Sequence, residues 1–486
     1  MSNNVIVLLS DEHSPLCMGN MNHYICKTPN LDKLSKEGTK FSNAYCTSPI
    51  CVPSRAGIAT GLYTFQNKNW DNAFPYEGKN ESWAHILNKH GHEAVSIGKL
   101  HYKNEKVSTG FSNQLQPMHV INGVGDIRGS IRENPLPREG ARKYIDEAGI
   151  GTSTYQKYDT KTTQKAIDWL SKKSFKIEKK SWVLFVSYSC PHFPLVAPKK
   201  FTDMYPIKDI LNPINHDRSE SLHPTNQIYA DLMGFNPAFT ERQIKKALRS
   251  YYALVTFVDY EIGKILNYVK QSRLKNNTTI IYSSDHGDNV GRDGLFGKST
   301  MYEESVGVPL IVKGKNFKKN YICKKNVSHI DLYQTILIES GIKKYNKPKD
   351  YLGMSLQASL SNRTRKYPVT SEYHATCSLD AITMMVYKNF KFIYHINFKH
   401  QLFDLKKDPN ELVNLSQNKK YKKIYNLIKS KIEKHINPKL INLEAKNHQK
   451  KLIKKHGGRK KILSQGTLGY TPAPGEKPDI SSKKKI

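Results

Sequence analysis

Long hydrophobic segments are absent from this chain of 486 residues. No apolar run approaches the roughly 20 residues that a membrane-spanning helix requires. The first one, VIVLLS at residues 5–10, has no basic leader before it and no small-residue cleavage site after it, so it does not fit a signal peptide. We therefore expect a cytoplasmic protein with no membrane partner.

Cysteine is scarce and shows no metal-type pattern. The chain has seven cysteines, an odd number, without the paired spacing that a zinc module or a disulfide framework uses: Cys17, Cys26, Cys46, Cys51, Cys190, Cys323 and Cys377. We therefore expect free thiols, and any functional cysteine must be identified from its neighbours.

Acidic residues are also few, 42 against 76 basic ones, which gives a formal net charge of +34. Such a charge invites a nucleic-acid partner. However, lysines are spread along the whole chain, and no basic and aromatic strand motif accompanies them. Only the end concentrates them, in KNHQKKLIKKHGGRKK (446–461) and KKK (483–485). We expect no nucleic-acid partner, and we expect this end to be solvated or to join subunits of a homo-oligomer.

The chain does contain the alternating pattern of an α/β fold. TERQ at 240–243 predicts the capped start of a long amphipathic helix that ends near residue 272. The polar stretches 121–155 and 198–239 predict surface excursions. Four continuous apolar runs predict strands of a mostly parallel sheet that helices cover on both faces: VIVLLS (5–10), EAVSIG (93–98), WVLFVSYS (182–189) and TTIIYSS (278–284).

The pattern changes after about residue 362. TMMVYKNFKFIYHI (383–396) and QLFDL (401–405) predict antiparallel strands, and a helix is expected from about residue 419. We therefore expect a main domain over residues 1–362, a smaller C-terminal α+β subdomain over 363–445 and a basic tail over 446–486.

Titratable residues follow each predicted strand of the main domain. In open α/β sheets the ligand site lies beyond the carboxyl ends of the strands, so these side chains should meet at one edge. Either acidic pair alone would also fit a helix cap or a surface cluster, but two pairs at equivalent strand ends favour a metal site. The two pairs are Asp11 with Glu12 and Asp285 with His286. Together they suit a divalent cation, and we expect Ca²⁺ first, with Mn²⁺ or Mg²⁺ as alternatives.

A second set of residues near the same edge is basic. A single histidine is usually structural, but several cationic groups that face a metal suit the binding of a tetrahedral oxyanion. The members of this set are Lys99, His101, His192 and Lys298.

One short segment is more specific than these sets. CVPSRAGIATG at residues 51–61 resembles the signature of the type I sulfatases, Cys-x-Pro-Ser-Arg followed by Thr-Gly. The resemblance covers nearly the whole chain and implies an alkaline phosphatase-like fold and sulfuric ester hydrolysis. Six further segments fit the family in the expected order: KTPNLDKLSKEGTKFSNAYCTSP (27–49), GKLH (98–101), PHFP (191–194), SDHGD (284–288), GKSTMYEESVGVPLIV (297–312) and QLFDLKKDPNELVNL (401–415).

The resemblance implies a role for each site residue. A formylglycine-generating enzyme would oxidise Cys51 to formylglycine (3-oxoalanine), which Arg55 would orient. One hydroxyl of the hydrated aldehyde would attack sulfur and the second would later expel sulfate, with His192 or Lys298 as proton donor to the leaving alkoxide. The acidic set would hold the metal, and the basic set would contact the sulfate.

Three positions depart from the common family pattern. Glu12 stands where many members have Asp, His286 where many have Asn, and Ala59 where Leu or Met is usual. An Asp–His pair also occurs in choline sulfatases and in phosphonate monoester hydrolases, so a phosphonate monoester or phosphodiester hydrolase is an alternative. An inactive basic binding protein is another, although the complete set of site residues argues against it.

The substrate is expected to be a small sulfate ester, because a polymeric sulfated glycan does not readily enter a cell. WDNA (70–73) and SEYHATCS (371–378) resemble segments of choline-sulfatase-like members and favour choline-O-sulfate or a similar alkyl sulfate, with sugar and aryl sulfates as alternatives. Trp70, Asp71 or Tyr373 are candidates for a wall around a cationic head group. His374 is a candidate for closing the pocket or for a buried structural role.

Overall fold

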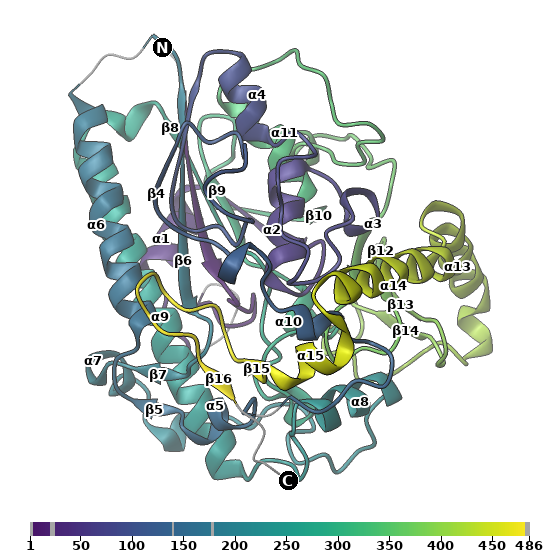
Figure 1. Ribbon diagram of the computed structural model, residues 1–486. Coiled ribbons are helices and arrows are strands. Elements are labelled where there is room, and N and C mark those ends of the chain that lie inside the picture. Colours follow the sequence, from purple (N-terminus) through teal and green to yellow (C-terminus); the bar gives the residue numbers. More distant parts are fainter. Residues whose placement is uncertain (1–2, 20–24, 139, 176–178, 482–486) are drawn as a thin grey trace.

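The protein is built around one large twisted sheet, seen in a computed structural model that describes residues 3–19, 25–138, 140–175 and 179–481 (Figure 1). The order of its eight strands is β10-β2-β9-β8-β1-β6-β3-β4, and β9 alone runs antiparallel to its neighbours. The strands are β1 (Asn4–Asp11), β2 (Thr39–Tyr45), β3 (Glu93–Lys99), β4 (Asn113–Met118), β6 (Trp182–Pro191), β8 (Thr278–Ser284), β9 (Leu310–Lys313) and β10 (Tyr321–Ser328).

The predicted α/β class is confirmed, and the four predicted apolar runs are adjacent strands at the centre of the sheet, in the order β8-β1-β6-β3. Their side chains are buried on both faces, as a parallel sheet between two helical layers requires. Alternate residues of β1 enter separate cores: Ile6 and Leu8 join one, and Val5, Val7 and Leu9 the other.

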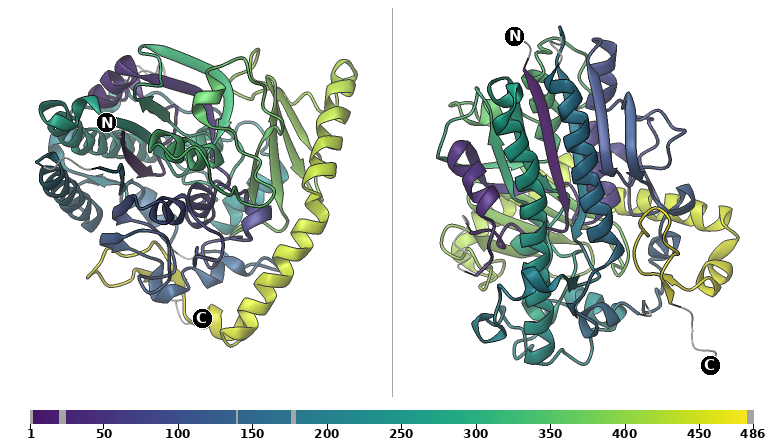
Figure 2. Two further views of the ribbon diagram at one scale, coloured as in Figure 1. Left: turned by 90° about the horizontal axis from the view of Figure 1, so that it is seen from above. Right: turned by 90° about the vertical axis from the view of Figure 1, so that its left-hand side faces the viewer.

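Helices cover each face of the sheet (Figure 2). The first core packs under α1 (Pro29–Glu37), α6 (Thr154–Ser174) and α9 (Glu241–Gln271). The second packs under α2 (Cys51–Thr60), α4 (Trp83–Lys89) and α11 (Ile330–Glu339). The long helix predicted from TERQ is α9, and its capping box is present because Thr240 Oγ1 accepts from Gln243 N.

The two predicted surface excursions hold mainly short elements that lie outside the sheet. They include η2 (Ile121–Gly123), η3 (Ile127–Ser130), α5 (Lys143–Asp146), β5 (Gly149–Ile150), α7 (Lys199–Thr202), η4 (Ile207–Asp209) and α8 (Pro224–Leu232). Elsewhere lie α3 (Thr64–Asn67), β7 (Val196–Ala197), η5 (Arg273–Asn276), η6 (Arg292–Gly294), α10 (Glu303–Val306) and α12 (Leu356–Ser359).

A second, antiparallel sheet follows in the C-terminal region, as predicted. Its strands are β11 (Val369–Tyr373), β12 (Ile382–Tyr387), β13 (Phe390–His395) and β14 (Gln401–Asp404). The helices after it are η7 (Lys419–Tyr421), α13 (Lys422–His435), α14 (Pro438–Lys455) and α15 (Gly458–Ser464), and α13 and α14 lie along one side of the molecule (Figure 2). Apolar residues of α13 and α14 pack on this sheet and on Trp70.

The basic C-terminal end is part of the folded body, with most of its lysines exposed. The predicted boundary between 445 and 446 falls inside α14, which buries Ala445 and Gln449 against the body. Beyond α15 the chain returns to the main domain and ends in a small pair of strands, β15 (Thr467–Leu468) and β16 (Ile480–Ser481). The run KKK at 483–485 lies outside the described residues.

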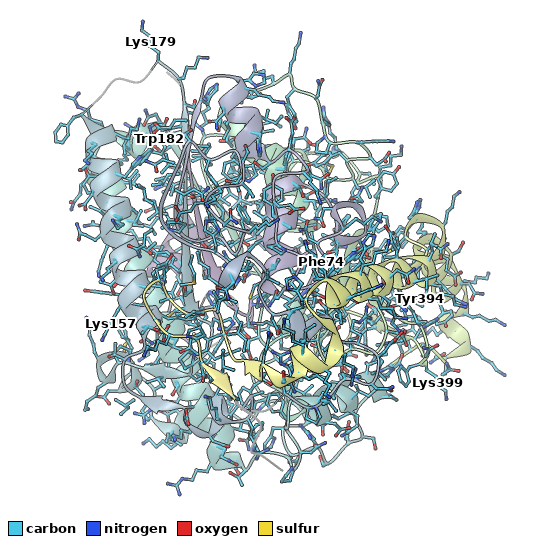
Figure 3. The ribbon with its side chains drawn as sticks, viewed as in Figure 1. Phe74, Lys157, Lys179, Trp182, Tyr394 and Lys399 are labelled. Atoms are coloured by element: carbon cyan, nitrogen blue, oxygen red, sulfur yellow. The ribbon has the colours of Figure 1, made fainter. Side chains whose placement is uncertain are left out.

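Many lysines do lie at the periphery. Lys157, Lys179 and Lys399 extend from the surface in Figure 3, whereas Trp182 is buried at the start of β6. Within the described ranges, no helix combines the length and apolar character needed to span a bilayer.

Candidate active site

The carboxyl ends of the four central strands bring the predicted site residues together. Asp11 is the last residue of β1 and Lys99 the last of β3. His192 follows β6 directly, and Asp285 follows β8 directly. Because the strands are parallel neighbours, these side chains meet at one edge of the sheet, as predicted.

Arg55 contacts three of the residues at this edge of the sheet. It lies one turn after Cys51 on α2, so both side chains project from the same face of that helix. Its guanidinium donates to Asp285 Oδ2 (2.7 Å, from Nε) and to Asp11 Oδ2 (3.0 Å, from Nη2). Nη1 donates to the carbonyl of Lys99 (2.6 Å). Arg55 is 2% exposed, so these are desolvated ion pairs that fix both carboxylates.

The thiol of Cys51 lies at the middle of this arrangement. Its Sγ is 3.2 Å from His286 Nε2 and 3.6 Å from Asp11 Oδ1. A helix N-terminus usually lowers a thiol pKa, but here burial and the charge of Asp11 raise the pKa of Cys51 well above its ordinary value. The unmodified thiol is therefore protonated and a poor nucleophile.

Asp11 is held in its ionised form. Burial by itself would raise its pKa, but the charges of Lys99, His192, Arg55 and His286 together hold the pKa of Asp11 well below its usual range. Lys99 Nζ lies 2.8 Å from Asp11 Oδ2. We call Asp11, Cys51, Arg55, Lys99, Asp285 and His286 the central cluster, and each is at most 2% exposed.

Glu12 faces a second group of side chains. Its Oε2 accepts from Lys298 Nζ (2.8 Å) and lies 3.3 Å from His192 Nε2. Burial raises the pKa of Glu12 to about 8, although Lys298 opposes this shift. Burial by itself would lower the pKa of Lys298, but Cys51, Glu12 and Asp11 together raise it. Burial and Lys298 lower the pKa of His192 well below its ordinary value.

His101 lies beside the central cluster without joining it by a hydrogen bond. Both of its ring nitrogens are buried and have no hydrogen-bond partner among the described residues. Burial and the charges of Lys99 and Arg55 lower its pKa well below the ordinary value. The predicted basic set is thus brought to one edge, but only Lys99, His192 and Lys298 contact a carboxylate.

The predicted acidic set divides into two groups that share Asp11. One potential ligand atom each from Asp11, Cys51, Asp285 and His286 lie within 4.8 Å of one another, and the same holds for Asp11, Glu12 and His192. His286 Nδ1 lies 2.9 Å from the carbonyl of Gly287, to which it donates, so Nε2, beside Cys51 Sγ, keeps the lone pair that could bind an ion. Glu12 Oε1 is buried, and no described residue forms a hydrogen bond with it. Oxygen-rich, buried and partly unsatisfied, these residues fit a hard divalent cation.

Several residues of the site were missed by the sequence reasoning. Lys99 Nζ lies over the ring of Tyr155, 5.4 Å from the ring centroid. The ring centroids of Tyr155 and His192 are 6.0 Å apart. Ser54 Oγ donates to the carbonyl of Asp285 (2.5 Å) and lies 3.1 Å from His329 Nδ1. Asn72 Oδ1 accepts from Val52 N at the start of α2. No motif marked Tyr155 or His329, whereas Asn72 lay within the quoted WDNA segment.

The outer side of the site is covered by residues 467–481, which we call the C-terminal strap. The ring of Tyr470 in the strap packs on Tyr155 at 5.2 Å between centroids, and Tyr155 OH donates to the carbonyl of Thr471 (2.6 Å). Phe193, next to His192, also faces Tyr470, at 6.5 Å. In Figure 1 the strap is the yellow segment that carries β15 and β16.

The side chains proposed for a cationic wall already have protein partners. Trp70 is fully buried, and its Nε1 donates to His448 Nδ1 (2.9 Å). Asp71 accepts from Ser130 Oγ and Gln449 Nε2, both at 2.8 Å. His374 is buried against Trp70, with Nε2 3.2 Å from Glu372 Oε1, an arrangement that fits its structural alternative.

Comparison with known proteins identifies the family of the chain. A family model described as Sulfatase matches residues 3–342, and one described as N-sulphoglucosamine sulphohydrolase, C-terminal, matches residues 291–438. The chain is 27% identical over 428 residues to the choline-sulfatase of Rhizobium meliloti (strain 1021). The aligned region covers 85% of this chain and 82% of that protein. It is 28% identical over 444 residues to arylsulfatase K of Homo sapiens, with 85% and 78% covered.

Solved structures share the fold. The phosphonate monoester hydrolase of Agrobacterium radiobacter superposes with a TM-score of 0.70 at 19% identity, over 92% of this chain and 96% of that chain. BT4656, solved in complex with its substrate D-glucosamine-2-N,6-O-disulfate, gives a TM-score of 0.70 at 21% identity, over 90% and 99%.

Proposed function

The chain belongs to the sulfatase family of sulfate ester hydrolases, and from this premise we propose that it cleaves a small organic sulfate ester with an oxidised Cys51 and a divalent cation. The observation that carries the proposal is the position of Cys51. Its Sγ lies within 3.6 Å of both Asp11 and His286, in a cluster where the thiol itself is unreactive. The raised pKa disfavours the reactive thiolate form of Cys51, so a change in the chemistry of this side chain would make it a better nucleophile.

Oxidation of Cys51 to formylglycine, by a formylglycine-generating enzyme, would supply that change, because a hydrated aldehyde offers an oxygen nucleophile in place of sulfur. Arg55 would then hold the modified residue as it holds Asp11 and Asp285. Ser54 and His329 support the same loop through the carbonyl of Asp285.

We propose Asp11, Asp285 and His286 as metal ligands, with Glu12 as the fourth, although in this structure Glu12 groups with Asp11 and His192 and faces Lys298. A bound divalent cation, Ca²⁺ in the first instance, would supply Lewis-acid charge that activates a hydroxyl and neutralises charge on the sulfate oxygens. Without an ion, the carboxylates of Asp11 and Asp285 and the carboxyl group of Glu12, whose pKa burial raises to about 8, face three fixed cations (Arg55, Lys99 and Lys298). Two further positive charges make the site electropositive and suited to a sulfate monoester.

Lys298 is the proton donor to the leaving alcohol in this proposal. Glu12 and Asp11 favour its charged form, so Nζ is protonated; the same shift makes Nζ a weaker acid, but an alkoxide is a stronger base still and can take its proton. The neutral form of His192 donates from Nδ1 to the carbonyl of Phe193 (2.7 Å), which leaves Nε2 as an acceptor. Lys99, beside Asp11, would contact the sulfate oxygens.

The experiment that tests the proposal is mass analysis of the Cys51 peptide after expression with a formylglycine-generating enzyme, followed by assay on sulfate esters. We expect loss of the thiol mass and activity in proportion to conversion. Full activity of protein that carries only the thiol would refute the mechanism.

A phosphonate monoester hydrolase is the second candidate. The Asp285–His286 pair is compatible with it, since such a pair occurs both in choline sulfatases and in phosphonate monoester hydrolases. Matched sulfate and phosphonate monoesters of one alcohol separate the two: a phosphonate preferred by orders of magnitude in kcat/KM would overturn the sulfatase assignment.

A further inference from the structure

A cavity of about 60 Å³ lies beside the proposed proton donor. Gly297, which precedes Lys298, lines it, and a Cβ on Gly297 would lie 3.6 Å from Glu12 Oε1. Phe193 also lines it, and this ring is 4.0 Å from the ring of His192 and 5.2 Å from Lys298 Nζ. The cavity therefore begins where the alcohol of a bound sulfate ester would leave.

The walls of this cavity are mainly apolar. They come from elements far apart in the sequence: Tyr144, Phe193, Met233, Phe235, Phe296 and Leu468. Tyr144 stacks on Phe193 with 4.8 Å between ring centroids. The outer wall is made by Thr467, Leu468 and Gly469 of the C-terminal strap.

The two charged residues of the lining, Arg138 and Asp288, already have partners within the protein. Arg138 Nη2 lies 3.0 Å from Asp126 Oδ2 and donates to the carbonyl of Leu468 (3.1 Å). Asp288 accepts from the backbone of Val290 (2.6 Å) and of Gly297 (3.0 Å). Arg138 is thus neutralised by Asp126, and both carboxyl oxygens of Asp288 already accept hydrogen bonds, so the apolar walls are the main surface left to contact a ligand.

We propose that this cavity receives the uncharged, apolar part of the alcohol of the substrate. The inference rests on the proposed function and names its substrate class: esters of short hydrocarbon or aryl alcohols, rather than cationic or polyhydroxylated ones. A volume of about 60 Å³ corresponds to about four to six water-sized groups at 10–15 Å³ each, which fits a chain of a few carbons.

The test uses two ligand series that differ only in chain length. Alkyl sulfates from methyl to hexyl are assayed on enzyme with verified formylglycine, beside choline-O-sulfate and a glucosamine sulfate. Alkanesulfonates of the same lengths, which cannot be hydrolysed, are titrated into unmodified, Ca²⁺-loaded protein by calorimetry. We expect kcat/KM and sulfonate affinity to rise by about fourfold per methylene, the factor for burial of one CH₂, until the cavity is full.

Met233→Trp, which fills the cavity from its wall, should remove the gain with chain length and leave methyl sulfate within about twofold. Leu440→Trp, an exposed leucine on α14, is the matched control and should keep the gain. A flat series in the wild type, a tenfold preference for choline-O-sulfate, or a gain that survives in folded Met233→Trp would overturn the inference while the sulfatase proposal stands. Length-dependent sulfonate binding without turnover of any ester would instead reject the sulfatase proposal and keep the cavity assignment.

Discussion

The central cluster and the C-terminal strap are close in space and opposite in physical character. Every member of the cluster is at most 2% exposed and is held by charged contacts such as the 2.7 Å pair of Arg55 and Asp285. In the strap only Thr467 and Ala473 are buried, and side-chain hydrogen bonds to Thr154, Tyr155 and Tyr144 hold it. Breaking a buried ion pair costs about 3–5 kcal/mol, whereas one such hydrogen bond contributes about 1 kcal/mol.

This contrast assigns different tasks to the two regions. Chemistry at a fixed geometry needs groups that do not move, and the cluster provides them. Access to a buried centre needs a segment that opens at low free energy, and segments with few buried apolar contacts have that property. Changes in the cluster should therefore remove turnover, and changes in the strap should alter how substrates are selected and bound.

The largest effect is expected from Cys51→Ala. Turnover should fall below detection because the nucleophile is lost, while the melting temperature changes little, since only one buried atom is removed. Cys323→Ala is the matched control, as Cys323 is also buried but lies on β10. Assay of kcat beside thermal unfolding checks both. Activity in Cys51→Ala would place the nucleophile elsewhere.

Asp285→Asn should be nearly as damaging, with kcat/KM reduced by several orders of magnitude, because a metal ligand is lost and Arg55 loses a buried partner. Metal content per chain should fall in parallel. Asp259→Asn is the control: Asp259 is a buried carboxylate that accepts from the backbone of Asn30 and Leu31 at the start of α1. It should lower stability and keep the activity of the folded protein. Full metal content and activity in Asp285→Asn would contradict the ligand assignment.

Lys298→Ala tests the proton donor through the leaving group. Without the donor, esters of alkyl alcohols should lose about 10²–10⁴ in kcat, whereas nitrophenyl sulfate, whose phenolate leaves without protonation, should lose far less. The slope of log kcat against leaving-group pKa measures this. An equal loss for both ester classes would assign Lys298 to sulfate binding and return the donor role to His192.

The cluster was largely predictable from the sequence, and the strap was not. Asp11, Lys99 and Asp285 follow strongly apolar strands, and the geometry of parallel sheets fixes where such residues meet. Arg55 follows Cys51 by one helical turn, so its position is also local information. What the sequence did not reveal was the division of the acidic set, since Glu12 turns toward Lys298 at a positive φ of 68°.

The position of the strap could not be predicted from the sequence because its contacts are long-range and polar. Residues 467–481 carry no apolar periodicity, so composition alone predicts solvent exposure. Their position depends on single pairings more than 300 residues apart in sequence, such as Tyr155 with Thr471 and Lys143 with Asp479. No local pattern encodes such pairings. Tyr155 was missed for the same reason, since its role depends on both the strap and Lys99.

Removal of the strap should have a moderate effect. A chain that ends at residue 466 should fold with a melting temperature within a few degrees of the intact protein. KM should rise by about tenfold, equivalent to about 1.4 kcal/mol of lost binding, and kcat should change less. Steady-state kinetics on one alkyl sulfate checks this. A loss of kcat as large as that of Asp285→Asn would show that the strap belongs functionally to the cluster.

The smallest effect concerns the pH dependence of the strap. Burial by itself would raise the pKa of Asp479, but Tyr144 OH (2.5 Å) and Lys143 Nζ (2.9 Å) lower it below the ordinary value. Its contribution to strap closure is therefore complete above about pH 4, the ordinary aspartate pKa, and is lost as pH falls through the lowered pKa. Because both partners are partly exposed, the contribution is at most about 1 kcal/mol.

Amide exchange at Gly469 measures this contribution, because the N–H of Gly469 donates to the carbonyl of Asp479. After correction for intrinsic rates, exchange at Gly469 should accelerate below pH 4 by no more than about fivefold, while Leu8 in β1 stays protected. Asp479→Asn should show faster exchange at every pH and no acid step, and an acid step that persists in this variant would assign it to another carboxylate.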